Sequence, residues 1–265
     1  TTSSSLPLQL NPTRIDIPFT TFGIMSMADI NNDGFVDLVI PFATVMTDPQ
    51  GTPAGQGVIY FGNGKNGFYK YLDAINDSAN FTQLIAVKVF LTDFNNDGYK
   101  DIFLPTFGMD VSPFYGEKDQ IYLSNINTGK WYSQSANINF KRDITHSGTV
   151  ADINNDGFID TFSGNLAGDN SELKNPYFLL NDGKGTFTFN IDRLPERLLN
   201  QSTIGKSALI LSESFSDLNG DGWNDLIVGG YGNKSQVFIS KQGYFSDINS
   251  KNLPQGFYED EKIGV

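Results

Sequence analysis

The chain contains no cysteine and only one histidine, His146, among its 265 residues. Without thiols it has no disulfides, no thiolate metal site and no thiol redox chemistry. Long apolar runs are also absent: the best stretch, residues 84–91, is interrupted by Lys88, and a spanning helix needs roughly 20 residues. No membrane span is therefore expected. The first five residues are polar and uncharged, so no signal peptide opens the chain and we expect a mature or excised piece.

Basic residues are scarce relative to acidic ones. Lysine and arginine total 18 against 30 aspartates and glutamates, which gives a formal net charge of −12. Such a surface repels nucleic acid and anionic lipid, so neither is expected as a partner. Hydrophobic residues at 39% and aromatic residues at 13% are still sufficient for a packed core.

One nine-residue segment occurs four times without gaps. Each copy follows the pattern D-x-N-x-D-G-aromatic-x-D, and the copies are named here loop 1 (residues 29–37), loop 2 (93–101), loop 3 (152–160) and loop 4 (217–225). Their first residues are 64, 59 and 65 positions apart. Regular spacing of this size indicates a repeat architecture.

The sequence around each loop predicts four short strands per repeat. Apolar runs precede and follow each loop, and a third run leads into a glycine hairpin such as residues 181–187. Asn-Gly and Asp-Gly pairs provide the positive φ of tight hairpins. The only helix-like candidates lie around residues 194–199. We therefore predict an all-β fold, one β-propeller region over residues 1–265 with at least four antiparallel blades, near residues 24–72, 86–139, 147–191 and 207–248.

The loops have the residue types and spacing of calcium sites. Ca²⁺ prefers six to eight hard oxygen ligands, and side chains at positions 1, 3 and 5 of a tight loop converge while the position-6 glycine permits the turn. Position 7 would add its carbonyl oxygen and position 9 a carboxylate. We predict about four Ca²⁺ ions, with these ligands: Asp29, Asn31, Asp33, Phe35 and Asp37; Asp93, Asn95, Asp97, Tyr99 and Asp101; Asp152, Asn154, Asp156, Phe158 and Asp160; Asp217, Asn219, Asp221, Trp223 and Asp225.

Two other interpretations of the loops are possible. An EF-hand would place glutamate at position 12, where this chain has Ile40, Leu104, Ser163 and Val228. Ordinary Asx turns would explain the Asp, Asn and Gly content, but they do not require three carboxylates at fixed offsets in every copy. The position-7 aromatic rings are expected to pack in the core or between blades, so that only their carbonyl groups reach the metal.

The loop, the strand after it and the N-D-G-x-G-x-F hairpin together resemble the VCBS/FG-GAP repeat family. The resemblance extends over residues 14–250, although clear FG-GAP tetrapeptides are missing. It implies the calcium-bearing propeller found in integrin α-subunits, lectin-like proteins and several polysaccharide lyases. It also implies a secreted or cell-surface location, where calcium is abundant. The scaffold serves many activities, so it does not name one.

The number of blades leads to a further expectation. We expect part of a larger ring of about seven blades, as in the resembling propellers, with open blade edges that permit self-association. A compact ring closed by the four blades alone is the alternative.

Function depends on the long loops at the other face of the predicted propeller. They carry aromatic and acidic residues suited to sugar rings, namely Phe42, Phe107, Phe114, Tyr115, Asp110, Asp119, Asp169 and Glu172. We expect a carbohydrate- or protein-binding adhesion module, with a glycan or an extracellular protein as partner. A polysaccharide lyase is the alternative. Its base and acid are usually drawn from His, Tyr, Lys or Arg, and the lone His146 has Lys141, Arg142 and Asp143 nearby. A structural repeat of a large surface protein is the third possibility.

Overall fold

Short apolar runs between turn residues form strands throughout the chain. The structure is a computed structural model that describes residues 24–42, 55–65, 67–71, 74–76, 81–83, 85–108, 116–134, 137–138, 141–166, 175–199, 209–231 and 235–252. The only helix of these residues is α1 (Glu196–Leu199), at the position expected from the sequence. No helix of the described residues is long and apolar enough to cross a bilayer.

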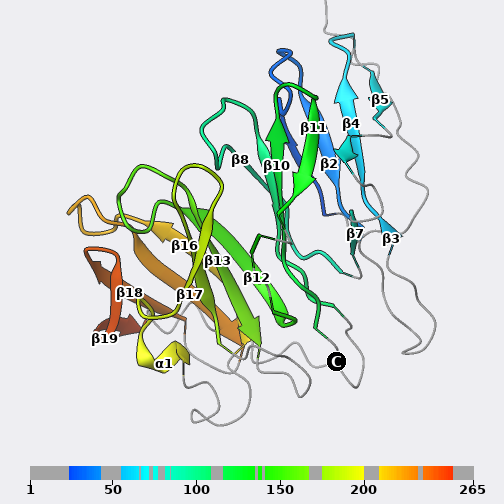
Figure 1. Cartoon of the computed structure of the whole chain (residues 1–265). Helices are drawn as coiled ribbons and strands as arrows, with labels where there is room; N and C mark the ends of the chain where they lie inside the picture. The colour runs from blue at the N-terminus through cyan, green and yellow to red at the C-terminus, as the bar shows by residue number, and fades with distance from the viewer. Residues whose placement is uncertain are drawn as a thin grey trace, which may run out of the picture.

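Four sheets follow one another in chain order, and each contains one loop (Figure 1). Sheet 1 contains β1 (Ser26–Ala28), β2 (Asp37–Ile40), β4 (Val58–Gly62) and β5 (Phe68–Lys70); sheet 2 contains β8 (Phe90–Thr92), β9 (Asp101–Leu104), β10 (Gln120–Asn125) and β11 (Lys130–Ser133); sheet 3 contains β12 (Ile144–Ala151), β13 (Asp160–Leu166), β14 (Tyr177–Asn181) and β15 (Phe187–Asn190); sheet 4 contains β16 (Leu209–Ser216), β17 (Asp225–Tyr231), β18 (Gln236–Lys241) and β19 (Tyr244–Asn252). The prediction of four-stranded antiparallel sheets is confirmed.

Two short pairings were not expected from the sequence. Strand β6 (Ile75–Asn76) adds a fifth, parallel strand outside β11, and β3 (Gly55–Gln56) pairs with β7 (Thr82–Gln83). Because β6 comes from the segment that connects sheets 1 and 2, this connection protects the outer edge of sheet 2.

The central strands of every sheet share one register. The second residue after the position-9 aspartate faces a residue of the third strand, in the pairs Val39–Ile59, Phe103–Ile121, Phe162–Phe178 and Ile227–Val237. Side chains alternate along a strand, so the pairs of sheets 1 to 3 face the next sheet, and Ile227–Val237 lies on the corresponding face of sheet 4. In sheets 2 to 4 the residues on either side of them face the previous sheet.

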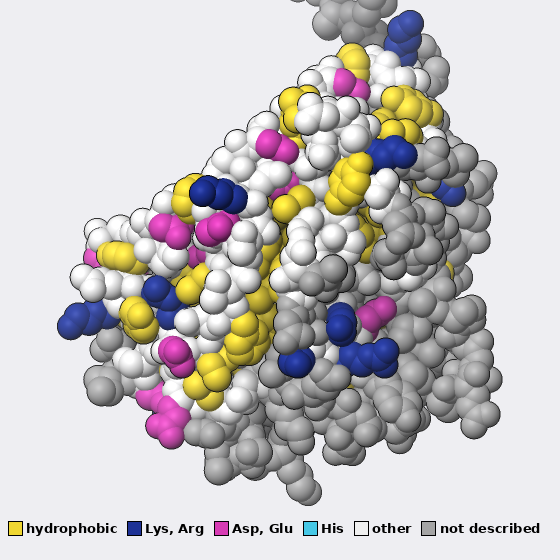
Figure 2. Space-filling view, in the orientation of Figure 1, with side chains coloured by type: hydrophobic (Ala, Val, Ile, Leu, Met, Phe, Trp, Pro, Cys, Tyr) yellow, Lys and Arg dark blue, Asp and Glu magenta, His cyan; other side chains and the backbone are white. Residues whose placement is uncertain are grey.

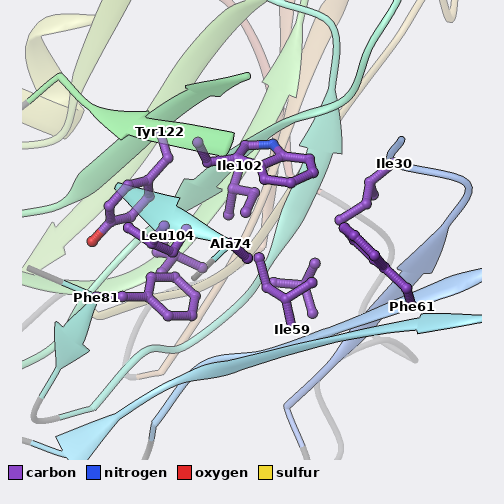
Figure 3. Close-up of a cluster of buried hydrophobic side chains, with 11 residues drawn as sticks. Ile30, Ile59, Phe61, Ala74, Phe81, Ile102, Leu104 and Tyr122 are labelled. Atoms are coloured by element: carbon purple, nitrogen blue, oxygen red, sulfur yellow. The ribbon is translucent and has the colours of Figure 1, made fainter. Parts of the chain in front are cut away.

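Large apolar clusters fill the spaces between neighbouring sheets. Between sheets 1 and 2, Val39 and Ile59 pack with Ile102, Leu104 and Tyr122 (Figure 3). Phe103 and Ile121 then pack against sheet 3, and Phe162 and Phe178 pack against sheet 4. Sheets 2 and 3 therefore each contribute one face to each of two interfaces.

The sheets form a row in which sheets 1 and 4 lie at opposite ends (Figure 1). The described residues form no closed ring, so the propeller and its blade number remain predictions.

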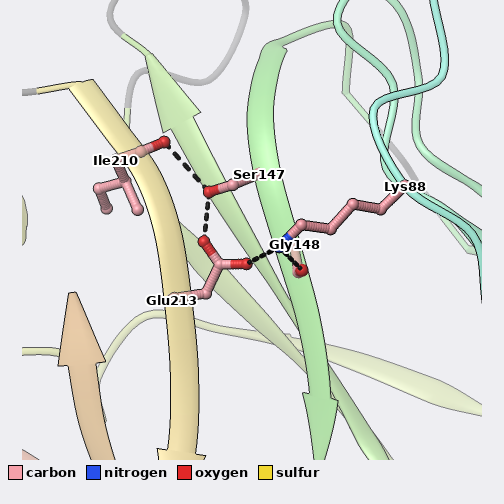
Figure 4. A network of polar contacts seen from close by, with 5 residues as sticks. All are labelled: Lys88, Ser147, Gly148, Ile210 and Glu213. Atoms are coloured by element: carbon pink, nitrogen blue, oxygen red, sulfur yellow. Dashed lines mark hydrogen bonds and ion pairs between the residues drawn. The ribbon is translucent and has the colours of Figure 1, made fainter. Parts of the chain in front are cut away.

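Polar contacts also join sheets 2, 3 and 4 close to the first strand of each sheet. Lys88, which precedes β8, donates to the Gly148 carbonyl in β12 and pairs with Glu213 in β16, whose carboxylate also contacts the Ser147 hydroxyl (Figure 4).

Candidate metal centre

The four loops occupy the same place in their sheets. Each joins the first strand to the second, between β1 and β2, β8 and β9, β12 and β13, and β16 and β17. Figure 1 shows these turns following one another along one edge of the molecule. Acidic side chains are spaced along the same edge in Figure 2. The loops therefore form a single acidic row.

Hydrogen bonds within each loop hold its carboxylates in the same arrangement. In loop 2, the Asp93 carboxylate accepts from the backbone N–H groups of Asp97 at 3.1 Å and Gly98 at 2.8 Å. The Asp97 carboxylate accepts from Tyr99 N at 2.9 Å and from the Asn95 amide at 3.1 Å. The corresponding bonds recur in loops 1, 3 and 4. The side chains at positions 1, 3 and 5 thus surround the same backbone turn.

The turn itself requires left-handed backbone at position 4. Asn32, Asn96 and Asn155 have φ values of 59°, 56° and 55°, and Gly220 has 78° in loop 4. Asparagine and glycine are the residues that adopt this conformation most readily. This explains why the variable x at position 4 is restricted to Asn or Gly.

The position-9 aspartates have a different environment from the other acids. All four, Asp37, Asp101, Asp160 and Asp225, are fully buried. One carboxylate oxygen accepts from the position-2 N–H and the other from an N–H at the end of the third strand, as between Asp101 and both Phe94 and Ser124 at 2.7 Å. These residues join the loop to the hairpin of the same sheet.

Burial shifts the titration of three of these aspartates. Desolvation raises the pKa of Asp101 to about 7 and that of Asp160 to about 6, and it raises the pKa of Asp37 as well. The backbone N–H donors act in the opposite direction because they stabilise the charged form. A nearby cation would also favour the ionised carboxylates.

The chemistry of the donors fits a hard cation such as Ca²⁺. Each loop offers three carboxylates and one amide, and each carboxylate oxygen that accepts one hydrogen bond retains a lone pair. Among the described residues, the position-7 carbonyl oxygens accept no hydrogen bond. No three acidic side chains of the described residues converge as a ready-made metal cage. Calcium would therefore share carboxylate oxygens that already accept from the backbone.

The position-7 aromatic rings pack against glycines of the hairpin. A Cβ atom on Gly183 would lie 2.3 Å from the Phe158 ring, and one on Gly64 would lie 2.2 Å from the Phe35 ring. Both glycines also have positive φ, at 74° and 66°. The two rings thus cover the third-to-fourth strand turn of their own sheets. They do not belong to the core, since Phe35 is exposed and Phe158 is half-buried.

Neighbouring loops are also joined to each other, which the sequence did not reveal. Asn32 of loop 1 donates to the Gly98 carbonyl of loop 2 at 2.7 Å, and Asn155 of loop 3 donates to the Gly222 carbonyl of loop 4 at 2.7 Å. In the reverse direction, Asn224 of loop 4 donates to the Asp152 carbonyl at 2.9 Å. The asparagine at position 4 was the available signal, but its target depends on how the sheets pack.

The long loops provide less of a ligand site than the sequence predicted. Phe107 is 7% exposed and packs with Ile85 and Ile144, and Asp119 is completely buried, so neither can meet a ligand. Phe42 is half-buried. The remaining predicted ligand-site residues, Asp110, Phe114, Tyr115, Asp169 and Glu172, lie outside the described residues.

The single histidine also has a packing role. The His146 ring lies edge-to-face on Phe107, with ring centroids 5.2 Å apart. This contact gives the His146 ring a packing partner.

Asp119 belongs to a buried acidic cluster between sheets 2 and 3. Its carboxylate accepts from Thr106 N at 2.7 Å, the Ser163 hydroxyl at 2.6 Å and the Tyr177 hydroxyl at 3.0 Å. Burial raises its pKa to about 6, and burial together with the charge of Asp119 raises the pKa of Asp143 well above its usual range. The cluster is a polar interface between sheets.

The family comparison finds one matching segment. Residues 93–163 match the family model of FG-GAP-like repeats. The match contains loops 2 and 3 together with the strands between them, and it confirms the resemblance to the FG-GAP and VCBS repeats. The search of curated protein sequences finds no significant match.

Solved structures with similar folds include a lectin from Agrocybe aegerita. That lectin is described as specifically recognising non-reducing terminal N-acetylglucosamine; it is 20% identical with a TM-score of 0.51, and the match covers 87% of this chain and 52% of the lectin. The V. cholerae biofilm matrix protein Bap1 is 15% identical with a TM-score of 0.36, and the match covers 87% of this chain and 39% of Bap1. This chain thus spans about half of the lectin's length. At this identity the similarity to the lectin concerns the fold alone.

Proposed function

We propose that this chain is an extracellular, calcium-binding β-propeller region that serves as a carbohydrate- or protein-binding adhesion module. The observation that carries the proposal is the row of four loops, each with the same hydrogen-bonded arrangement of three acids and one amide. A purely structural turn would not require three mutually repelling carboxylates at the same offsets in every copy. Cations in the loops would offset much of the net charge of −12.

In each loop the side chains at positions 1, 3, 5 and 9 and the carbonyl at position 7 would hold the calcium. Loop 2 would use Asp93, Asn95, Asp97, Asp101 and the Tyr99 carbonyl. When bound, calcium supplies a fixed double positive charge that links the first two strands of the sheet. The chain's own part is to orient these oxygens through the turn and through the buried position-9 aspartate.

Ring extension is part of the same proposal. The position-2 side chains of loops 1 to 3 are buried against the next sheet, as Ile30, Phe94 and Ile153 show, whereas Leu218 of loop 4 is 48% exposed. Ile227 is half-buried, although its counterparts in the other sheets are completely buried. The face of sheet 4 that carries Leu218 and Ile227 therefore suits a further blade of a larger ring or, by self-association, a second copy. Light scattering of the chain and of an L218D variant tests the second outcome, because only association would respond to the substitution.

A glycan is the favoured partner, because an N-acetylglucosamine-binding lectin shares the fold and an exposed rigid repeat scaffold suits ligand-binding loops. A glycan array that includes terminal N-acetylglucosamine, probed in calcium and in excess EGTA, tests this proposal. Saturable binding that is lost in EGTA supports it. Lack of binding to any glycan would favour a protein partner or a structural role, and turnover of acidic polysaccharide would favour the lyase alternative.

A further inference from the structure

Two equivalent hydrogen bonds connect the loops in pairs, and loops 3 and 4 share a third, from the Asn224 side chain to the Asp152 carbonyl. The Asn32 side chain reaches 66 positions along the chain to the Gly98 carbonyl, and the Asn155 side chain reaches 67 positions to the Gly222 carbonyl. In both pairs the donor occupies position 4 and the acceptor position 6. The same relationship therefore occurs twice, between loops 1 and 2 and between loops 3 and 4.

The accepting peptide group belongs to the predicted metal centre. The Gly98 carbonyl shares a planar peptide unit with Tyr99 N, which donates to the Asp97 carboxylate at 2.9 Å. Fixing this peptide plane therefore orients the Asp97 carboxylate. It also restricts the position of the Tyr99 carbonyl, which belongs to the next peptide unit. In loop 4 the Gly222 carbonyl likewise shares a peptide unit with Trp223 N, which donates to the Asp221 carboxylate at 2.9 Å.

The donating residue is equally close to predicted ligands. Asn32 lies between Asn31 and Asp33, and its positive φ of 59° sets the turn that brings them together. Ordering of loop 1 around a cation would therefore hold the Asn32 side chain in place for its bond to loop 2. Ordering of loop 2 would in turn hold the acceptor.

We propose that Asn32 and Asn155 are positioning residues that couple the loops in two pairs, so that a cation bound at one loop raises the affinity of its partner. The inference rests on the proposed calcium binding. The energetic basis is the conformational entropy lost when the peptide group that joins the two loops is ordered. The first cation to bind orders this group, so the second cation binds without that cost. One hydrogen bond of this kind corresponds to a coupling of about two- to tenfold in affinity.

Asn96, at the boundary between loops 2 and 3, provides an internal control for this proposal. Asn96 has the same left-handed backbone, with φ of 56°, but among the described residues it donates no hydrogen bond to loop 3. That interface is bridged instead by Asn181 of β14, which donates to the Phe94 carbonyl at 2.7 Å. Gly220 at the same position of loop 4 indicates that glycine preserves the turn.

The experiment compares the variants N32G, N155G and N96G of the full chain. Each substitution removes the side chain, keeps the backbone conformation and adds similar flexibility to the unfolded state. Calorimetric titration of the calcium-free protein with calcium chloride gives the affinities. N32G and N155G are expected to weaken calcium binding by about two- to tenfold at two sites each and to reduce cooperativity, whereas N96G leaves the titration unchanged.

The outcomes distinguish the coupling from calcium binding itself. If N32G, N155G and N96G all titrate like the wild type, calcium binding stands and the coupling is overturned. If the wild type takes up no calcium, both proposals are overturned. Circular dichroism establishes that each variant is folded. Should N32G fail to fold, N32D takes its place, because aspartate tolerates the same φ but presents an acceptor to the Gly98 carbonyl.

Discussion

The Lys88 ammonium lies 3.2 Å from the Glu213 carboxylate, although 125 positions separate the two residues. The Glu213 side chain is completely buried, and that of Lys88 is 38% exposed. Ser147 of β12 contacts the other oxygen of the same carboxylate. A single buried acid thus connects the segment before β8 with the first strands of sheets 3 and 4 (Figure 4).

Removal of Lys88 should destabilise the fold more at high pH than at low pH. The variant K88M leaves Glu213 buried without its cation, and burial already raises the pKa of Glu213. Ionisation of the isolated carboxylate is costly, so urea unfolding should show a loss of about 1–3 kcal/mol at pH 8 and a smaller loss at pH 5. The variant K241M, which removes an exposed lysine, is the control. Equal losses at both pH values would show that Glu213 does not depend on Lys88.

Calcium should bind with a stoichiometry of about four and stabilise the folded chain. Each of the variants D33N, D97N, D156N and D221N should lose one equivalent of calcium, because each removes the position-5 carboxylate of one loop. At a hundred times the dissociation constant, each site adds about 2.7 kcal/mol to the free energy of unfolding. Metal analysis after dialysis and thermal unfolding in calcium and in EGTA measure both effects. A folded sample without calcium, or a melting temperature unaffected by EGTA, contradicts the prediction.

The fold could be predicted from the sequence because the signals are local and repeated. The loops, the flanking apolar runs and the glycine hairpins each lie within a few residues, and they define the strands of all four sheets. The prediction of ligand-site residues in the long loops was less accurate. Asp119 reads as an exposed loop acid, but it is buried by Ser163 and Tyr177, which lie 44 and 58 positions away. Burial of this kind depends on how sheets 2 and 3 meet.

The asparagine bridges were missed for the same reason. Asn32 and Asn155 are found within a pattern that the sequence explains by turn geometry alone, since left-handed backbone favours asparagine. Their carbonyl partners belong to the next repeat. Only the arrangement of adjacent sheets places the Gly98 and Gly222 carbonyls within reach.

The calcium-free protein should become less stable as the pH rises through about 6. The pKa of Asp119 is about 6 in the folded chain and that of Asp143 is also raised, so the folded state retains protons that the unfolded state releases from pH 4 upward. The free energy of unfolding then falls by up to about 1.4 kcal/mol per pH unit for each retained proton. Urea unfolding between pH 4.5 and 8 measures this slope.

A matched pair of variants isolates the buried cluster in this pH dependence. D143N removes one buried acid. Its amide oxygen can still accept from Asn165, and its amide N–H can donate to the Thr145 hydroxyl oxygen, which donates to Asp143 in the wild type. D192N removes one exposed acid and changes the net charge by the same amount. The slope should be shallower for D143N and unchanged for D192N. Identical slopes for both variants would assign the effect to net charge.

Alanine at Gly183 should destabilise the chain more than alanine at Gly129. Both glycines have positive φ, at 74° and 64°, so both substitutions strain the backbone. A new Cβ meets the Phe158 ring at 2.3 Å in the first case and open space in the second. Thermal unfolding should show a loss of about 1–3 kcal/mol for G183A, with a smaller loss for G129A. Equal losses would mean that the Phe158 ring moves aside without cost.

The position-9 aspartates have a consequence for the order in which the chain assembles. Each of them joins a loop residue 7 positions away to a strand end no more than 25 positions away. Contacts between residues so close in sequence form quickly, because little chain entropy is lost in closing short segments. A sheet can therefore acquire its buried anchor from its own residues alone. On a ribosome, each sheet can close behind the one before it while the rest of the chain is still being made.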